Sequence, residues 1–533
     1  MKLSLSITKI IIFADKYREF NCQQMNQDHE NKQLPKWRLK LLPWIKWTVL
    51  LILISIPLFG GLDKVPIRFW DESRSAINAY EMHQNGNYLI PHFNGEPDMW
   101  STKPPLMIWL QTAAMKIVGV NELAVRLPSA IAAFLTCLLL LLFARSYLKN
   151  TLFGIVAVFV LITSGGYIEM HGTRTGDYDA LLTLFTTMAG LAFFMFCEYE
   201  NRQFLYLFFL TSILAVLTKG ISGMFFFPSF FIYALVRKKI TIFLKNRHFY
   251  IGIGLFLFFV CGYYLLRESF NPGYIQAVWQ NELGGRLLTV IEGHDHPFLF
   301  FHSNFILYRF IPWYFILPLG IIAGFLIKDD KIRKLTLFSF LMALGLFLLI
   351  SSSQTKLPWY DTQMFPFLAL LIPPSFEFLF RWCAKIRKSG FLWLQKVLPF
   401  FIMVLVFIVP YVHIVKKTCY PQRSHYIKGE QEVDYYLQEV YRGRHIHPGQ
   451  FLVFEDYGAP HDFYLKMIQE KGIPMEYKSK DKIESGDVIV LFQESVQKII
   501  EQKFEFELLS QEGTVLICKI GEKKTEKPDT ETE

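Results

Sequence analysis

Two adjacent carboxylates, Asp71 and Glu72, lie in a long polar stretch over residues 63–122, just beyond a strongly apolar run. A carboxylate at such a place can take a proton as a general base or help to bind a cation. Neighbouring residues at the start of a helix point in different directions, so one acid can face a site while the other caps the helix. The alternative is that both acids only cap a helix over residues 73–84.

Lys103 lies in the same stretch, directly before Pro104 and Pro105. The two prolines fix an extended approach, and Pro104 fits the first turn of a following helix. This arrangement would hold Lys103 at a helix N-terminus, where an anion such as a phosphate is favoured. The alternative is a lysine whose ammonium group only reaches out to lipid headgroups.

Three further polar segments between apolar runs carry ionisable side chains. Such groups beside an apolar span are costly, and they are usually paired or functional. Cations gathered here would suit a phosphate, a carboxylate would suit a general base, and a lipid-linked phosphate would enter sideways from the bilayer. The residues are Arg174 and Asp179 in segment 171–180, Lys219 in segment 218–220, and Lys356, Tyr360 and Asp361 in segment 351–361.

The sequence does not define a metal centre. His294 and His296 would point to the same side of an extended chain, but no third ligand is evident. We therefore predict no metal ligand and no definite cofactor. A divalent cation bound with the help of Asp71 stays an open alternative.

The elements that position these residues follow from composition. Of the 533 residues, 52% are hydrophobic and only 19% are charged, and the mean hydropathy is +0.28. Repeated apolar runs approach the roughly 20 residues that cross a bilayer, which excludes a secreted, cytosolic or disordered chain. Lipid offers no partner to a bare backbone amide, so the spans must be helical. The net charge of +9 fits basic cytoplasmic loops, and no nucleic-acid motif is present.

We predict an all-α polytopic membrane protein with about 11 to 13 transmembrane helices and a cytoplasmic N-terminus. Basic clusters at 145–149, 237–247, 328–334 and 381–388 support this orientation. It places the long loop 63–122 and the other polar segments on the extracytoplasmic face. The predicted spans are 42–62, 123–145, 152–168, 180–198, 203–218, 221–236, 249–266, 303–327, 333–351, 361–380 and 391–414, with further helices within 104–119 and 284–303.

Three regions follow from this pattern. Residues 1–41 form a cytoplasmic tail, and residues 42–415 form the membrane domain with its catalytic loop at 63–122. Residues 416–533 are no longer apolar and contain strand-like runs at 451–454, 488–492 and 514–520, and helical stretches at 430–441 and 494–503. They predict a small extracytoplasmic α/β domain that ends in a charged tail.

Several motifs occur at defined spacings along the chain. The first loop reads Asp71-Glu-x-Arg74-x-Ala76, Glu81-Met82, Pro91, Asn94-Gly95, Lys103-Pro-Pro-Leu106, Trp109, Asn121-Glu122 and Arg126-Leu-Pro128. Later segments read Arg174-Thr-Gly-Asp-x-Asp179-Ala-Leu-Leu-Thr183, Thr218-Lys-Gly220 and Thr355-Lys-Leu-x-x-Tyr360. Over residues 42–415 this pattern resembles the lipid-phosphate-sugar glycosyltransferases of the GT-C fold. That family joins the protein O-mannosyltransferases and the bacterial aminoarabinose-to-lipid A transferases.

The resemblance implies a role for each matching position. Asp71 would be the catalytic carboxylate, Glu72 would support it, and Lys103 would bind the phosphate of a polyprenyl-phosphate sugar donor. The sugar would pass with inversion to a lipid or protein acceptor on the periplasmic face of a bacterial inner membrane. Ser75 departs from the family, which often has Tyr there. Further implied residues are Arg74, Arg174 and Lys356 for the donor phosphate, and Asp179, Tyr360 and Asn94 for the sugar or acceptor.

Two other functions fit parts of the pattern. A transporter or flippase of a lipid-linked or anionic substrate would also place charges in apolar surroundings. Transporters tend to hold such charges near the bilayer midplane, on broken helices within paired repeats. The charges here gather in loops, and we find no internal repeat. An O-antigen ligase-type enzyme shares the donor class but lacks the first-loop pattern. The sequence identifies neither the sugar nor the acceptor.

Overall fold

The computed structural model describes residues 36–169, 171–287, 289–290, 293–384, 392–421, 430–444, 450–455 and 457–524. The chain divides into two compact units. The helical unit comprises the described parts of Met1–Gly60, Thr102–Met107 and Pro128–Tyr420, and the mixed unit those of Gly61–Ser101, Ile108–Leu127 and Pro421–Glu533. The predicted loop 63–122 is therefore grouped largely with the C-terminal segment.

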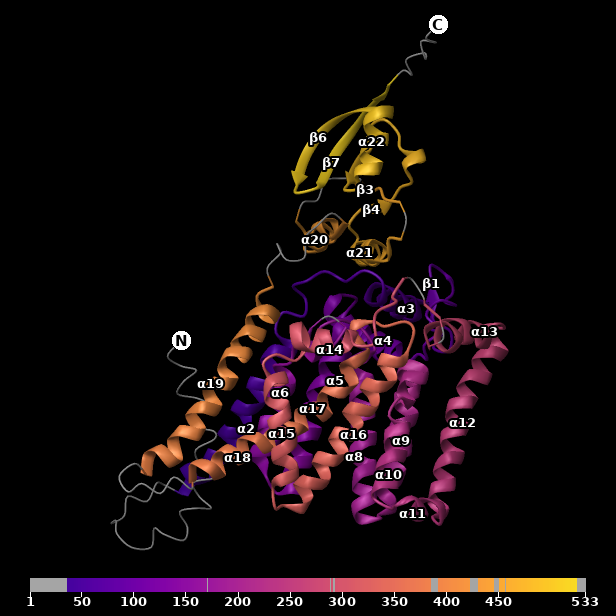
Figure 1. Ribbon diagram of the computed structural model, residues 1–533. Coiled ribbons are helices and arrows are strands. Elements are labelled where there is room, and N and C mark those ends of the chain that lie inside the picture. The colour runs from indigo at the N-terminus through magenta and orange to yellow at the C-terminus, as the bar shows by residue number, and fades with distance from the viewer. Residues whose placement is uncertain are drawn as a thin grey trace. The chain divides into compact units, whose positions relative to one another are not determined.

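The helical unit is built from apolar helices, several of which run side by side, such as α8, α9 and α12 (Figure 1). Helices α4 (Leu106–Val118) and α5 (Glu122–Phe143) contribute residues to both units. The other α-helices of this unit are α2 (Lys36–Phe59), α6 (Thr151–Ile162), α7 (Gly165–Ile168), α8 (Asp179–Tyr199), α9 (Arg202–Lys219), α10 (Phe227–Val236), α11 (Ile240–Leu244), α12 (Arg247–Phe270), α13 (Tyr274–Val278), α14 (Phe300–Asn304), α15 (Trp313–Leu326), α16 (Asp330–Ser352), α17 (Phe365–Leu371), α18 (Pro373–Ala384) and α19 (Leu392–Cys419). Short 3-10 or π turns lie at η1 (Ala144–Leu148), η2 (Gly220–Met224), η3 (Trp279–Leu287), η4 (Phe305–Arg309) and η5 (Pro358–Met364).

The polytopic helical fold predicted from the sequence is confirmed. Among the described residues, seven helices are long and apolar enough to cross a membrane. Five shorter apolar helices, of 10 to 17 residues, lie within other segments where the sequence predicted a helix: Trp44–Phe59, Leu106–Val118, Thr151–Ile162, Phe227–Val236 and Trp313–Leu326.

One predicted span is irregular, although Pro358–Cys383 still counts among the seven candidate membrane helices. The apolar run 361–380 is divided among η5, α17 and α18. Pro366 lies at the start of α17, and Pro373 and Pro374 begin α18. A proline has no backbone N–H and clashes with the preceding turn, so it is tolerated at a helix start but interrupts a helix interior.

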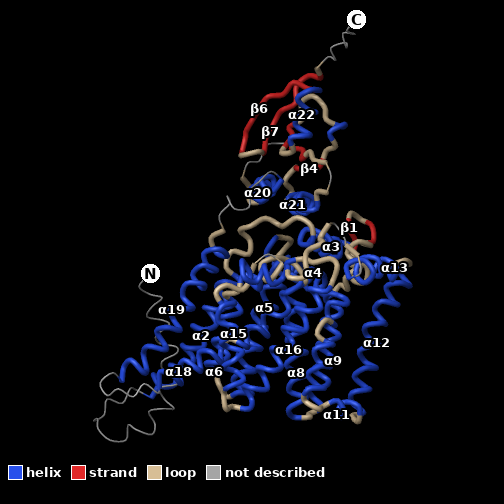
Figure 2. Tube along the Cα trace, in the orientation of Figure 1, coloured by secondary structure: helices blue, strands red, loops and turns tan. Residues whose placement is uncertain are grey.

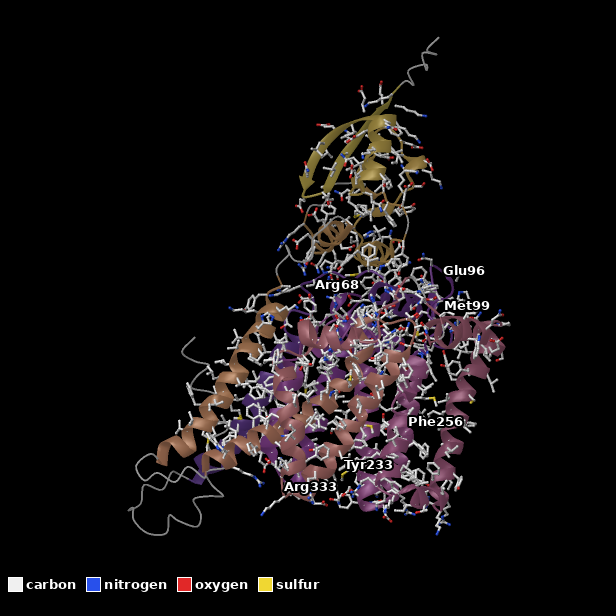
Figure 3. The ribbon with its side chains drawn as sticks, in the orientation of Figure 1. Arg68, Glu96, Met99, Tyr233, Phe256 and Arg333 are labelled. Atoms are coloured by element: carbon white, nitrogen blue, oxygen red, sulfur yellow. The ribbon has the colours of Figure 1, made fainter. Side chains whose placement is uncertain are left out.

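The core of the helical unit is rich in aromatic rings. Phe338 packs against Phe194 and Tyr233, with ring centroids 5.2 and 4.9 Å apart. Figure 3 shows Tyr233 and Phe256 among the helices of this unit. Close helix contacts depend on glycine at several positions, such as Gly320 and Gly252. A Cβ on Gly320 would lie 2.1 Å from the carbonyl oxygen of Leu371, and one on Gly252 would lie 2.0 Å from the ring of Phe209.

The mixed unit contains α3 (Asp71–Asn85) and a small hairpin of β1 (His92–Phe93) and β2 (Glu96–Pro97). Its C-terminal segment forms the five-stranded sheet that Figure 2 shows in red, in the order β4-β3-β5-β7-β6. Strand β3 is parallel to β4 and β5, whereas β7 is antiparallel to β5 and β6. The elements are α20 (Glu430–Tyr441), β3 (Gln450–Leu452), α21 (Ala459–Glu470), β4 (Met475–Tyr477), the 3-10 turn η7 (Lys480–Lys482), β5 (Val488–Leu491), α22 (Glu494–Lys503), β6 (Phe504–Glu512) and β7 (Val515–Lys523).

The sheet confirms the small α/β domain predicted from the sequence. The three predicted strands correspond to β3, β5 and β7, and the two predicted helices to α20 and α22. Strands β4 and β6 and helix α21 were not predicted. The core of the sheet includes Ile489 and Cys518, both fully buried.

Candidate active site

Asp71 is the first residue of α3 and is partly exposed. The residue before it, Trp70, has a backbone φ of +69° and ψ of −111°. Bulky L-residues rarely adopt positive φ, and such a conformation costs about 1–3 kcal/mol unless the surroundings enforce it. Strained residues of this kind cluster at functional sites, so the backbone itself singles out the position of Asp71.

Glu72 has different surroundings from its neighbour. It is 1% exposed, and its carboxylate accepts hydrogen bonds from Arg126 at 2.6 and 2.9 Å. It also accepts one from the backbone N–H of Arg68 at 2.8 Å. Arg126, 2% exposed, donates further to the main-chain oxygens of Leu62, Val65 and Pro66. Glu72 therefore ties the loop before α3 to α5, and its implied support of Asp71 in catalysis stays a prediction.

Arg74, on the same helix, makes a second ionic contact. It forms a two-point ion pair with Asp98, at 2.8 Å for both contacts, and its guanidinium lies 4.3 Å from the ring centre of Phe93. Burial opposes the charge of Asp98, but the bonds from Arg74, Ser101 and Asn78 outweigh it and hold the pKa of Asp98 below its ordinary value. The predicted phosphate-binding role of Arg74 stays a prediction.

Asn94 occupies the turn between β1 and β2, with φ at +54° and Gly95 at +83°. Asn-Gly is the pair that two-residue hairpin turns favour, because both residues tolerate positive φ. Asn94 is exposed. Its local geometry is explained by the turn, and its predicted contact with sugar or acceptor stays a prediction.

Lys103 belongs to the helical unit and stands just before α4, which begins at Leu106. Its ammonium lies 5.4 Å from the ring centre of Tyr178, a cation–π contact. The carbonyl of the preceding Thr102 accepts a hydrogen bond from the hydroxyl of Tyr274 at 2.7 Å, which fixes this segment. Among the described residues, no carboxylate forms an ion pair with Lys103.

Asp179 and Lys219 form a buried ion pair in the same unit. The ammonium of Lys219 lies 2.7 Å from both oxygens of Asp179, and the two residues are 8% and 3% exposed respectively. Lys219 also lies 5.9 Å from the ring centre of Tyr360. Two of the predicted sugar residues, Asp179 and Tyr360, thus both contact Lys219, which is not among the predicted site residues.

His171 and Asp177 form a second buried pair. Nδ1 of His171 lies 3.2 Å from Oδ2 of Asp177, and the imidazole stacks on the indole of Trp359 with centroids 3.6 Å apart. Burial opposes ionisation of Asp177, but His171 and the hydroxyl of Thr175 hold its pKa below the ordinary value. His171 has φ at +59°, another backbone constraint at a polar residue.

Two predicted phosphate ligands have other partners. The guanidinium of Arg174 donates to the carbonyls of Pro57, Leu58, Gly60 and Thr418, at 2.7 to 3.4 Å. The ammonium of Lys356 donates to the carbonyl of Ser353 at 2.6 Å and is buried. The bonds from Arg174 join the C-terminal ends of α2 and α19, and the bond from Lys356 stays within its own loop. They favour a structural role, and phosphate binding by either residue stays a prediction.

The structure thus assigns the predicted residues to two groups. Asp71, Glu72, Arg74 and Asn94 belong to the mixed unit, and the others to the helical unit. Three residues of the second group form buried ionic pairs but are not among the predicted site residues: His171, Asp177 and Lys219. Their signal was available, because each is an ionisable residue at the edge of an apolar run, where charge must be paired or functional.

Parts of the chain are similar in sequence to known proteins. A family model described as dolichyl-phosphate-mannose-protein mannosyltransferase matches residues 102–264. An uncharacterized protein of Aquifex aeolicus (strain VF5) is 30% identical over 337 residues, which are 61% of this chain and 63% of the relative. The undecaprenyl phosphate-alpha-4-amino-4-deoxy-L-arabinose arabinosyl transferase of Aeromonas salmonicida (strain A449) is 26% identical over 350 residues, 63% of this chain and 60% of the relative. The chain therefore spans about three fifths of the length of these relatives.

A solved structure extends the comparison to most of the chain. ArnT from Cupriavidus metallidurans, bound to undecaprenyl phosphate, matches with a TM-score of 0.66 at 14% identity. The match covers 89% of this chain and 97% of that chain. At this identity the likeness establishes the fold, because one fold can serve several functions. The chain has the predicted GT-C fold, and parts of it are similar in sequence to the glycosyltransferases named above.

Proposed function

We propose that this protein is a membrane glycosyltransferase that moves a sugar from a polyprenyl-phosphate donor to an acceptor on the extracytoplasmic face. The observation that carries the proposal is the contrast between the two adjacent acids. Glu72 is buried and held by Arg126, while Asp71 is partly exposed at a strained helix start. Relatives described as undecaprenyl-phosphate aminoarabinose transferases support the donor class.

In the proposed reaction, Asp71 takes the proton of the acceptor hydroxyl as its oxygen attacks the anomeric carbon. The bond between that carbon and the phosphate oxygen breaks, and the polyprenyl phosphate leaves as an anion. Attack from the face opposite the leaving group inverts the anomeric centre. Lys103 neutralises the leaving phosphate, which needs charge stabilisation rather than a general acid. Its place just before the first turn of α4, where an anion is favoured, supports this role.

Three features of the proposal reach beyond the residues of the site. The acceptor is a lipid or a protein, and the sugar is either a hexose or a pentose. The protein lies in a bacterial inner membrane, with the loop 63–122 and the C-terminal domain in the periplasm. A reporter fused after Lys239 should behave as cytoplasmic and one fused after Gln431 as periplasmic, and the opposite result at either fusion overturns the orientation.

The first experiment asks what the cell loses. The glycans and lipid A of a strain lacking the protein are profiled by mass spectrometry. Loss of one sugar from one acceptor class supports the proposal and identifies both substrates. An unchanged profile, together with impaired movement of a lipid-linked precursor across the membrane, would instead support a transporter.

The second experiment tests the two residues directly. Purified protein receives undecaprenyl-phosphate-linked 4-amino-4-deoxy-L-arabinose, or the sugar found in the profile, with membranes of the deletion strain as acceptor. Asp71→Asn should lower turnover by about 10²-fold or more while binding of undecaprenyl phosphate survives. Lys103→Met should abolish that binding at normal expression. Asp63→Asn and Lys116→Met are matched controls on exposed residues and should behave like the parent. Near-full turnover of Asp71→Asn refutes the proposed base.

A further inference from the structure

The strained turn before α3 needs an external restraint. Trp70 combines a positive φ with a large side chain that is 64% exposed, so burial does not hold its indole in place. Its main-chain oxygen accepts bonds from the N–H of Arg74 at 2.9 Å and from the hydroxyl of Ser73 at 3.1 Å. These bonds fix the backbone that follows the turn. They involve the main chain of Trp70 and not its indole.

Tyr457 contacts the turn from the C-terminal segment of the same unit. Its ring stacks on the indole of Trp70, with centroids 4.8 Å apart and planes 10° apart. Its hydroxyl donates to the main-chain oxygen of Trp70 at 3.4 Å and interacts with the side chain of Ser73. The same ring lies parallel to Phe93, with centroids 6.3 Å apart. Tyr457 is thus placed between Trp70 and the hairpin of β1 and β2.

The stacked rings of Trp70, Tyr457 and Phe93 extend to the ion pair between Arg74 and Asp98. Phe93 carries the guanidinium of Arg74 over its ring, and Arg74 is held by Asp98. A residue that lies 387 positions beyond Trp70 therefore completes a layer of side chains around the first turn of α3. Strained backbone conformations persist only where the surroundings over-determine them, and this layer supplies that restraint.

We propose that Tyr457 is a positioning residue, which holds the Trp70–Asp71 turn so that the carboxylate of Asp71 keeps its direction. The inference rests on the proposed role of Asp71. It gives the C-terminal domain a part in the transfer reaction, since its loop between β3 and α21 carries Tyr457. A shift of about 1 Å in a reacting group can cost about 10²-fold in rate, so a relaxed turn should lower turnover without altering donor binding.

The test is a double-mutant cycle between Tyr457 and Trp70. Tyr457→Ala should lower kcat by about 10²-fold, with the KM for donor and the affinity for undecaprenyl phosphate unchanged. Tyr457→Phe keeps the ring and should retain turnover to within about fivefold. Trp70→Gly allows positive φ without strain, so adding Tyr457→Ala to Trp70→Gly should cost little more. Tyr477→Ala, a half-exposed tyrosine of β4, is the matched control and should leave turnover unchanged.

Each outcome separates the positioning role from the proposed function. Equal losses from Tyr457→Ala in the parent and in the Trp70→Gly background would overturn the proposal, as would parent-like kcat of Tyr457→Ala. A loss of undecaprenyl phosphate binding or of thermal stability in Tyr457→Ala alone would show a merely structural role. If Asp71→Asn transfers sugar normally in the same assay, the proposed base fails instead, whatever the cycle shows.

Discussion

The buried pair of Glu72 and Arg126 allows a quantitative prediction. Arg126 makes five hydrogen bonds, two to Glu72 and three to main-chain oxygens of the loop before α3. Replacing Arg126 by Met removes all five and leaves the Glu72 carboxylate buried without its counter-charge. Breaking a buried ion pair in this way costs about 3–5 kcal/mol.

That free energy converts into a measurable shift. For domains of about 150 to 250 residues, each kcal/mol lowers Tm by about 2–4 °C, so Arg126→Met should lower Tm by about 6–20 °C. Glu72→Met leaves Arg126 charged and buried, and should cost a similar amount. Thermal unfolding of detergent-purified protein, followed by near-UV circular dichroism, measures both shifts.

The double variant distinguishes a buried charge from lost packing. Glu72→Met combined with Arg126→Met leaves no buried charge. The loss of Tm in this double variant should therefore be much smaller than the sum of the losses in the two single variants. The three main-chain oxygens still lose their donor, so the double variant should remain below the parent. Additive losses, or single variants as stable as the parent, would refute an energetic role for the ion pair.

Three further predictions concern other parts of the chain. The pKa of Asp98 is lowered in the folded state, so the ionised carboxylate stabilises the fold above the ordinary carboxyl pKa, and this stabilisation disappears as pH falls through the lowered pKa. Between about pH 5 and pH 2 the Tm of the parent should therefore fall by more than the Tm of Asp98→Asn. Gly320→Ala should cost about 1–3 kcal/mol because its Cβ meets a main-chain oxygen, while Gly254→Ala, which meets nothing within 4 Å, should be neutral in the same melting assay. Lys219→Met leaves Asp179 buried without a counter-charge and should reduce the monodisperse fraction in size-exclusion chromatography, and adding Asp179→Asn should restore part of it.

The membrane spans could be predicted because the bilayer imposes one dominant requirement. A helix that crosses lipid must be apolar over most of its length, and that pattern is local in sequence. The irregularity within 361–380 is also encoded locally, by Pro366, Pro373 and Pro374. A prediction based on the mean hydropathy of the segment gives one continuous helix instead. Strand β6 was missed because its alternating pattern is weak: most of Phe504–Glu512 is exposed or partly exposed, including Leu508 and Leu509.

For the candidate site, the sequence gives the residue types but not their contacts. The sequence shows that Arg174 is a cation beside an apolar run, but not that its donors point at the carbonyls of Pro57, Leu58 and Gly60. The partner of Glu72 lies 54 positions away, and the ring that stacks on Trp70 lies 387 positions away. Such pairings depend on the path of the whole chain, which no local spacing encodes.

The two adjacent acids work together through helix geometry. Consecutive residues of an α-helix point about 100° apart, so a helix that turns Glu72 inward must turn Asp71 toward a different side. The bonds from Arg126 and from the N–H of Arg68 fix the rotation of the first turn of α3. Fixing that rotation contributes to the direction of Asp71, which also depends on the turn at Trp70. A buried ion pair contributes little net stability compared with well-packed apolar side chains of similar volume. The Glu72–Arg126 pair therefore supports the proposed chemistry by helping to orient Asp71 rather than by stabilising the fold.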